Sequence, residues 1–279
     1  MILLLHFARR ALPALGKLSN LGARHALGLL AAALALLLAL PAIAADHDTP
    51  QTEIEAGYGE ARLSSRSSNW RNIFVDANHP FKNLKLPSSG LRETRRFGLS
   101  GNEVYGGLYY PLAPTWTGLF EGSLSPVHEA PPEYTLGAQL QKILPYGWIA
   151  GVGFRHNEYT RSASHVRTFS LERYWGDFHS TYTLFSGKPE GGAHASAHRF
   201  QVNYYYGNAS AMGIAYTTGR DMENLGLTAA LLATDVRNWT LSGRHWFARD
   251  WAVTYEALAN RQGGPYPREG LRLGLRYRF

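Results

Sequence analysis

The chain ends in nine residues that alternate apolar with cationic or small side chains: Leu271-Arg272-Leu273-Gly274-Leu275-Arg276-Tyr277-Arg278-Phe279. Successive side chains of a β-strand point to opposite faces of a sheet, so a period of two indicates a strand with two different faces. The odd-numbered residues form a wholly apolar face, and the even-numbered residues form a polar one. This stretch therefore predicts a strand that separates an apolar from a polar environment.

The same alternation continues toward the N-terminus. In 147–159, for example, Trp148, Ala150, Val152 and Phe154 share one face. Segments of this kind, separated by turn residues, predict fourteen strands, at 52–62, 69–78, 91–101, 103–112, 115–125, 133–143, 147–159, 164–175, 177–187, 197–206, 209–219, 235–247, 250–262 and 269–279. Twelve strands is the alternative, because 79–90 would be an unusually long connection and the segment 103–105 barely separates two strands.

Aromatic residues gather beside the expected turns: Trp70, Tyr110, Trp116, Tyr146, Trp148, Tyr159, Tyr174, Trp175, Trp246, Trp251 and Tyr277. A soluble sandwich would not need them there, whereas transmembrane barrels carry an aromatic girdle at each membrane interface. Backbone groups in lipid must be paired internally, so the sheet must close and the first strand must pair with the last. We expect an all-β fold, a transmembrane antiparallel up-and-down β-barrel.

The expected connections alternate in length. Short ones lie at 111–114, 144–147, 176, 207–208 and 248–249, and longer ones near 126–132, 188–196, 220–234 and 263–268. Periplasmic turns are short and extracellular loops are long in bacterial barrels. This pattern predicts that both ends of the barrel sequence lie on the periplasmic side.

Residues 1–44 are typical of a cleaved signal peptide, followed by a barrel domain at 45–279. Basic residues precede an apolar stretch at 27–40, then Pro41 and the small-x-small sequence Ala42-Ile43-Ala44. A retained anchor helix is the alternative, since about 20 apolar residues span a bilayer. Pro41 and the small residues favour cleavage, and no later window is apolar enough to predict a second membrane helix.

The composition excludes several classes of chemistry. The chain has no cysteine, which rules out disulfides, thiolate metal sites and cysteine nucleophiles. Four basic residues precede the apolar stretch, so the remainder has 24 basic and 21 acidic residues. A net charge of only +3 does not predict a nucleic-acid partner.

Several stretches resemble the YaiO family of outer-membrane β-barrel proteins: GWIAGVGFRHNEY (147–159), LERYWG (171–176), NYYYG (203–207), GRHW (243–246) and QGGPYPREGLRLGL (262–275). The likeness covers about 50–279. The terminal aromatic and the alternating apolar residues before it are similar to the C-terminal signal of bacterial outer-membrane barrels, here Leu271, Leu273, Leu275, Tyr277 and Phe279. The resemblance implies a bacterial outer-membrane location, with the barrel assembly machinery and membrane lipid as partners, and no established catalytic residues.

The polar face carries charges of both signs, as expected of a polar lumen. By parity the inward set is Glu53, Glu55, Glu121, Arg155, Glu172, Arg199, Arg244, Glu256, Arg272, Arg276 and Arg278. Buried charges must be paired or hydrated. These residues therefore either brace the barrel by pairing or line a water-filled path, and the sequence leaves both alternatives open.

No catalytic, cofactor or metal site is expected. His179 and Ser180 lie near Asp177, but neighbouring residues of a strand face opposite ways and cannot act as base and nucleophile. His128-Glu129 is a second weak hydrolase candidate. His194 and His198 lack a third metal ligand and are interpreted as surface histidines.

Three functional hypotheses remain. The leading one is a narrow pore for small solutes or polysaccharide, because a polar face runs through every strand. The second is a non-conducting structural or interaction barrel whose long connections bind partners. A membrane-embedded hydrolase comes third, and we expect no enzymatic activity. The sequence does not indicate an oligomeric state.

Overall fold

The computed structural model describes residues 51–64, 69–79, 85–207, 209–223, 231–263 and 266–279. The expected signal peptide at 1–44 lies outside the described residues. Among the described residues, no helix is long and apolar enough to cross a membrane.

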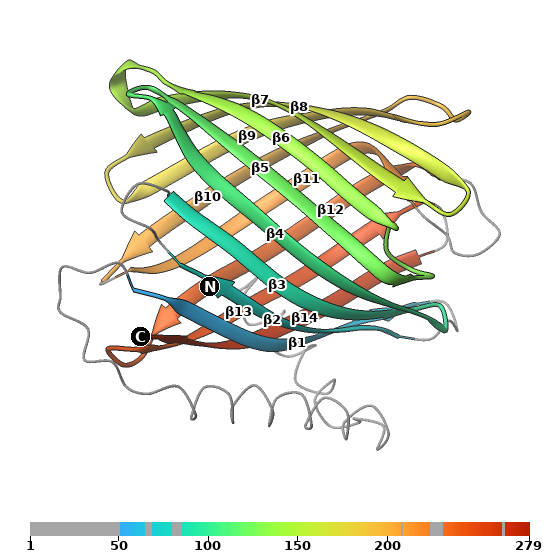
Figure 1. Cartoon of the computed structure of the whole chain (residues 1–279), viewed down its shortest axis with the longest axis horizontal. Coiled ribbons are helices and arrows are strands. Elements are labelled where there is room, and N and C mark those ends of the chain that lie inside the picture. The colour runs from blue at the N-terminus through green and yellow to red at the C-terminus, as the bar shows by residue number, and fades with distance from the viewer. Residues whose placement is uncertain (1–50, 65–68, 80–84, 208, 224–230, 264–265) are drawn as a thin grey trace. The chain divides into compact units, whose positions relative to one another are not determined.

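The described chain is a closed barrel of fourteen antiparallel strands, which confirms the predicted fold and the larger strand number (Figure 1). The strands are β1 (Glu53–Leu63), β2 (Trp70–Asn78), β3 (Lys85–Arg96), β4 (Leu99–Ala113), β5 (Trp116–His128), β6 (Tyr134–Ile143), β7 (Trp148–Tyr159), β8 (Ser162–Trp175), β9 (Phe178–Pro189), β10 (Ala195–Tyr206), β11 (Ser210–Glu223), β12 (Leu232–Trp246), β13 (Trp251–Gln262) and β14 (Tyr266–Arg278). A 3-10 turn, η2 (Pro145–Gly147), joins β6 to β7.

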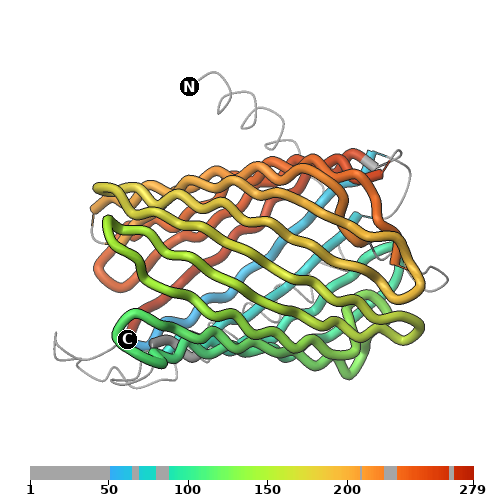
Figure 2. Tube along the Cα trace, turned by 90° about the horizontal axis from the view of Figure 1, so that it is seen from above, coloured from blue at the N-terminus to red at the C-terminus, as the bar shows by residue number. Residues whose placement is uncertain are grey.

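Each strand pairs with its sequence neighbours, and β1 pairs with β14 to close the sheet. The strands are inclined to the barrel axis, as Figure 2 shows from above. At the closing seam Ile54 lies opposite Tyr277 and Ala56 opposite Leu275, and the Phe279 amide donates to the Thr52 carbonyl at 2.9 Å. The first and last strands therefore begin and end at the same end of the barrel. Which membrane side this end faces stays a prediction.

The outer wall of the barrel exposes large apolar side chains. Val152 and Phe154 on β7 are 51% and 48% exposed, and Phe169 on β8 is 49% exposed. The buried hydrophobic residues are mostly small, with alanine the commonest. An apolar surface of this kind is stable against hydrocarbon rather than water, so the outer wall is the lipid-facing one.

The connection between β3 and β4 differs from the sequence prediction. The turn lies at Phe97 and Gly98, not near 103–105, and the long connection shrinks because β3 begins at Lys85. Phe97 and Gly98 have φ values of 54° and 79°, the left-handed conformation that two-residue hairpin turns require. Glycine adopts it readily, but phenylalanine rarely does, so the sequence pattern did not place a turn here.

Four aromatic residues expected in the lipid-facing girdles instead share the face of the lumen charges: Trp70, Tyr159, Tyr174 and Trp246. Trp70 lies beneath two guanidinium groups, with Arg96 4.7 Å and Arg268 4.3 Å from its ring centroid. A position beside a turn fixes the height of a residue in the membrane. Its parity along the strand decides whether it faces lipid or lumen.

Candidate functional site in the barrel lumen

An ionic cluster of the lumen lies at the closing seam and joins β1 to β14. Arg276 bonds Glu53 at 2.8 Å and Glu55 at 2.5 Å, and Arg278 bonds Glu53 at 3.2 Å. The Glu55 side chain is 6% exposed and also accepts a hydrogen bond from Thr254 on β13 at 2.6 Å. Antiparallel register explains the cluster, because Glu53 lies opposite Arg278 and Glu55 opposite Arg276. These side chains tie three strands together around the seam.

A second lumen cluster continues from the seam across β2, β3 and β4. Arg272 lies 3.5 Å from the Asp76 carboxylate, and its guanidinium group is 3.6 Å from the Phe74 ring centroid. Asp76 also accepts a hydrogen bond from the Tyr105 hydroxyl. Arg92 stands over the Tyr105 ring and pairs with Glu103 at 3.4 Å.

Asp76, Arg92 and Glu103 are lumen charges outside the set predicted from the sequence. Asp76 was detectable, because it shares parity with Phe74 on a strand that was correctly predicted. Arg92 and Glu103 were hidden by the misplaced turn between β3 and β4, since an incorrect strand boundary obscures which residues oppose each other.

The wall opposite the seam, at β5 to β9, holds a separate polar network. Arg155 on β7 pairs with Glu121 on β5 across the intervening strand. Glu172 on β8 accepts a hydrogen bond from Gln141 on β6 at 3.1 Å and lies 2.9 Å from His179 Nε2 on β9. This wall therefore combines one ion pair with amide, imidazole and hydroxyl groups.

The remaining predicted lumen charges are Arg199, Arg244 and Glu256. The Arg244 guanidinium donates to the Ala209 carbonyl at 2.9 Å and lies 6.0 Å from the Trp246 ring centroid. Arg199 and Glu256 make no hydrogen bond or ion pair with another described residue, although Glu256 lies opposite Arg272 in the register. These three residues therefore do not join the seam cluster through an ion pair.

A cavity of about 310 Å³ lies against the inner wall of β4 to β9. Its lining includes four members of that network and several further polar side chains: Glu121, Arg155, Gln141 and Glu172, with Gln139, Thr168, Ser170, Thr181 and Thr183. Tyr109 and Phe185 add aromatic surface. The cavity offers many uncharged hydrogen-bonding groups beside a few charged ones.

The histidines considered for catalysis or metal binding are engaged in other contacts. His179 Nε2 faces both Glu172 and the Thr181 hydroxyl, whereas a catalytic histidine uses one ring nitrogen for each partner. Ser180 instead bonds the Trp175 indole N–H on the outer wall. His194 and His198 contact Ser186 and Tyr182, and among the described residues no group of three ligands fits a metal ion.

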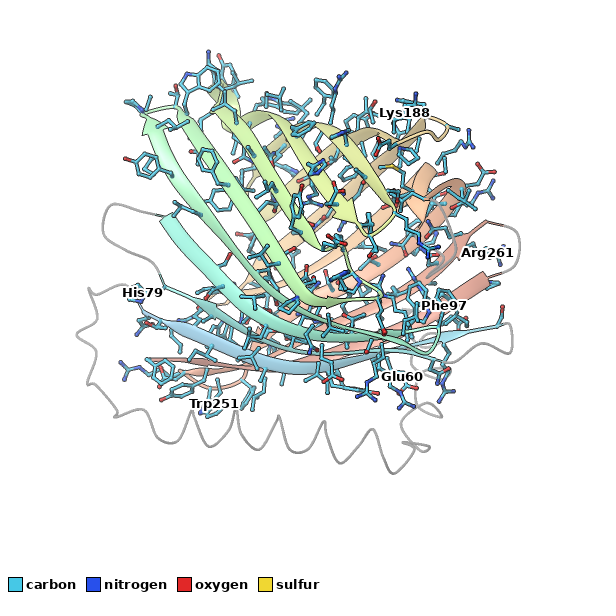
Figure 3. All side chains as sticks on the ribbon, turned by 45° about the vertical axis from the view of Figure 1, so that its right-hand side comes forward. Glu60, His79, Phe97, Lys188, Trp251 and Arg261 are labelled. Carbon is cyan, nitrogen blue, oxygen red and sulfur yellow. The ribbon has the colours of Figure 1, made fainter. Side chains whose placement is uncertain are left out.

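The apolar residues of the C-terminal stretch lie on the lipid-facing side of β14, on the opposite face from its arginines: Leu271, Leu273, Leu275, Tyr277 and Phe279. The Phe279 ring stands edge-on to Tyr277 with 4.8 Å between centroids, and Tyr277 packs on Trp251 of β13 at 4.6 Å. Figure 3 shows Trp251 at the same end of the barrel as His79, and Figure 1 marks the C-terminus at that end.

A closed antiparallel barrel with an apolar outer wall and a charged lumen defines a bacterial outer-membrane β-barrel protein. Residues 51–224 match the YaiO membrane beta barrel domain. The chain therefore belongs to that family, and its location is the bacterial outer membrane. No curated protein sequence is significantly similar to it.

Solved structures with a similar fold include outer-membrane barrels of low sequence identity. A bacterial polysaccharide outer-membrane secretin aligns with TM-score 0.52 and 8% identity, over 82% of this chain and 98% of its own. OpdQ of Pseudomonas aeruginosa aligns with TM-score 0.50 and 7% identity, over 83% of this chain and 99% of its own. At these identities the likeness shows the fold alone.

Proposed function

We propose that the barrel is a narrow pore for small hydrophilic solutes. The main support for this proposal is that the lumen ion pairs run along the barrel wall and not across the lumen. Among the described residues, every lumen ion pair joins strands that are neighbours or next neighbours in the sheet, such as β1 with β14 and β5 with β7. The charges therefore lie paired along the wall, where they do not bridge the lumen.

The lengths of the connections support an open path. The eight connections made entirely of described residues, at 97–98, 114–115, 129–133, 144–147, 160–161, 176–177, 190–194 and 247–250, have two to five residues each. Barrels that are closed by protein use long inserted loops or a plug. Connections this short are too short to fold into the lumen as a plug.

The chemistry of the cavity suggests the class of solute. Gln139, Ser170, Thr181 and Thr183 present amide and hydroxyl groups, and the ion pair of Glu121 with Arg155 contributes both signs of charge. A wall of this kind can exchange hydrogen bonds with hydrated solutes without strong preference for one charge. We therefore expect weak ion selectivity and passage of small neutral polar molecules.

Single-channel recording in planar bilayers tests the pore. Purified wild-type barrel should give steady ion current. Thr183→Trp should reduce that current by at least half, because its side chain lines the cavity. Leu184→Trp is the matched control: Leu184 lies next in sequence and opposite the lipid-facing Phe169, so the current should not change.

The same recording separates the pore from a non-conducting barrel. The seam cluster favours the latter as the second candidate, because the ion pairs between β1 and β14 and the hydrogen bond from Thr254 of β13 stiffen the wall whether or not it conducts. Silence from folded wild-type protein, or equal currents from both tryptophan variants, would reject the proposed pore.

A further inference from the structure

Two arginines lie directly opposite each other on the lipid-facing wall, at the end of the barrel away from the chain termini. Arg237 on β12 is the register partner of Arg261 on β13. Both have the parity of the outward Trp239, and both are exposed. Figure 3 shows Arg261 at the same end as Phe97 and Lys188, and opposite His79 and Trp251. Like charges directly opposite on paired strands destabilise a sheet, so an anion that contacts both arginines would stabilise this arrangement.

None of the described residues supplies that anion. Neither arginine makes a hydrogen bond or ion pair with another described residue. The nearest acid along β12, Asp235, is 4.0 Å from Arg220 of β11. On β14, Glu269 lies opposite Arg62 and Ala259 in the register. By contrast, the outward Arg95 pairs with Glu93 at 2.9 Å.

An aromatic pair fixes the depth of the two arginines in the membrane. Trp239 is 50% exposed and lies nearer the middle of the barrel than Arg237 and Arg261 do. Its ring packs on Tyr216 of β11 with 4.5 Å between ring centroids. Exposed tryptophan and tyrosine on a barrel wall mark the boundary between hydrocarbon and headgroups. Arg237 lies two residues beyond Trp239, roughly 7 Å further along the strand. This places its guanidinium group at the level of lipid phosphates.

We propose that Arg237 and Arg261 form a clamp for the phosphate of an anionic lipid headgroup. Two guanidinium groups side by side present several N–H donors, and guanidinium binds phosphate in a bidentate manner. The bound phosphate removes the repulsion between the two cations and takes the place of an acidic side chain. With the termini on the periplasmic side, as the connections predict, the clamp faces the outer leaflet, whose phosphate-bearing glycolipid is its ligand. The clamp is independent of the proposed pore.

Native mass spectrometry of the detergent-purified barrel tests the clamp. The wild type should retain bisphosphorylated lipid A, and phosphatidylglycerol more weakly, in preference to zwitterionic phosphatidylcholine. Arg237→Gln combined with Arg261→Gln should weaken lipid A binding about tenfold, because each arginine near a membrane surface contributes to binding an anionic lipid. Arg237→Lys with Arg261→Lys keeps the charge and should recover part of the binding.

The matched control is Lys142→Gln with Arg173→Gln, which removes two outward cations at the other end of the wall. Those cations stand over the Trp116 and Trp148 rings at 4.9 and 5.1 Å. This variant should bind lipid A as the wild type does. Equal retention by the Arg237/Arg261 glutamine variant would overturn the clamp. Competition by inorganic phosphate at the same concentration as lipid would also overturn it, because the site would then recognise a free anion rather than a headgroup.

Discussion

Gly137 shows how a single residue shapes the lumen network. It lies on β6 between Glu121 of β5 and Arg155 of β7, directly opposite both. A Cβ atom at this position would lie 2.6 Å from Glu121 Cγ, a distance that packed atoms do not adopt. Glycine therefore lets a carboxylate reach a guanidinium group two strands away.

Gly137→Val should break the pair of Glu121 with Arg155 and destabilise the barrel by about 1–3 kcal/mol, the usual cost of overpacking. Thermal unfolding in detergent, followed by heat-modifiable migration, measures the change. Gly122→Val is the control, since Gly122 faces outward and the nearest atom to its Cβ position is the Thr135 carbonyl oxygen at 3.4 Å. The same loss of stability in both variants would contradict a role for space above Gly137.

The last strand, β14, makes different contacts on its two faces. Its inward arginines hold the seam, and its outward residues form an apolar stripe that ends in an aromatic cluster. Phe279 makes contacts on two sides: its backbone amide donates a hydrogen bond to the Thr52 carbonyl, and its ring packs on Tyr277. The final residue thus contributes to strand pairing and to the lipid-facing surface.

Phe279→Ala should lower the amount of assembled barrel in the outer membrane, because the terminal aromatic is part of the expected assembly signal. Quantifying heat-modifiable protein in membrane fractions measures this. Phe120→Ala removes a lipid-facing ring that is more exposed than Phe279, at 49%, in the middle of the wall. If assembly falls equally in both variants, the loss reflects apolar surface rather than the C-terminal signal.

Closure of the barrel between β1 and β14 brings together charges that lie more than two hundred residues apart in the sequence. Arg276 and Arg278 meet Glu53 and Glu55 because the first strand pairs with the last. In the poorly hydrated seam these contacts resist the separation of β1 from β14. The barrel therefore closes through matched ion pairs as well as through backbone hydrogen bonds.

Reversing one side of the seam, Arg276→Glu with Arg278→Glu, should lower the thermal stability of the barrel in detergent. Adding Glu53→Arg with Glu55→Arg should restore part of the loss, since opposite charges across a strand pair contribute about 0.2–1 kcal/mol each. A double-mutant cycle isolates this coupling from the separate cost of each change. Strictly additive losses would show that the pairs do not stabilise closure.

The class of fold could be predicted from the sequence alone, because side-chain alternation is a local property of a strand. The parity of residues such as Val152, Phe154 and Leu275 separated lipid face from lumen face before any pairing was known. The predicted strand positions match the structure closely at the turn marked by Gly176, whereas β5 continues through Pro126 to His128 and β14 includes Pro267, so proline did not mark the strand end there. The turn at Phe97 and Gly98 has phenylalanine, not glycine or proline, in its first position, so the predicted turn position was wrong there. Because of that error, the pairing of Arg92 with Glu103 was not predicted.

Which charges meet, and which cations have no ion pair with another described residue, depends on the three-dimensional arrangement of the strands. Parity places Glu121 and Arg155 in the lumen, but their contact also requires the space above Gly137 on the strand between them. Parity likewise places Arg237 and Arg261 in the lipid-facing wall, but their direct opposition follows from the register of β12 with β13. Register depends on turn geometry and on the closure of the whole sheet, so no local pattern in the sequence specifies it.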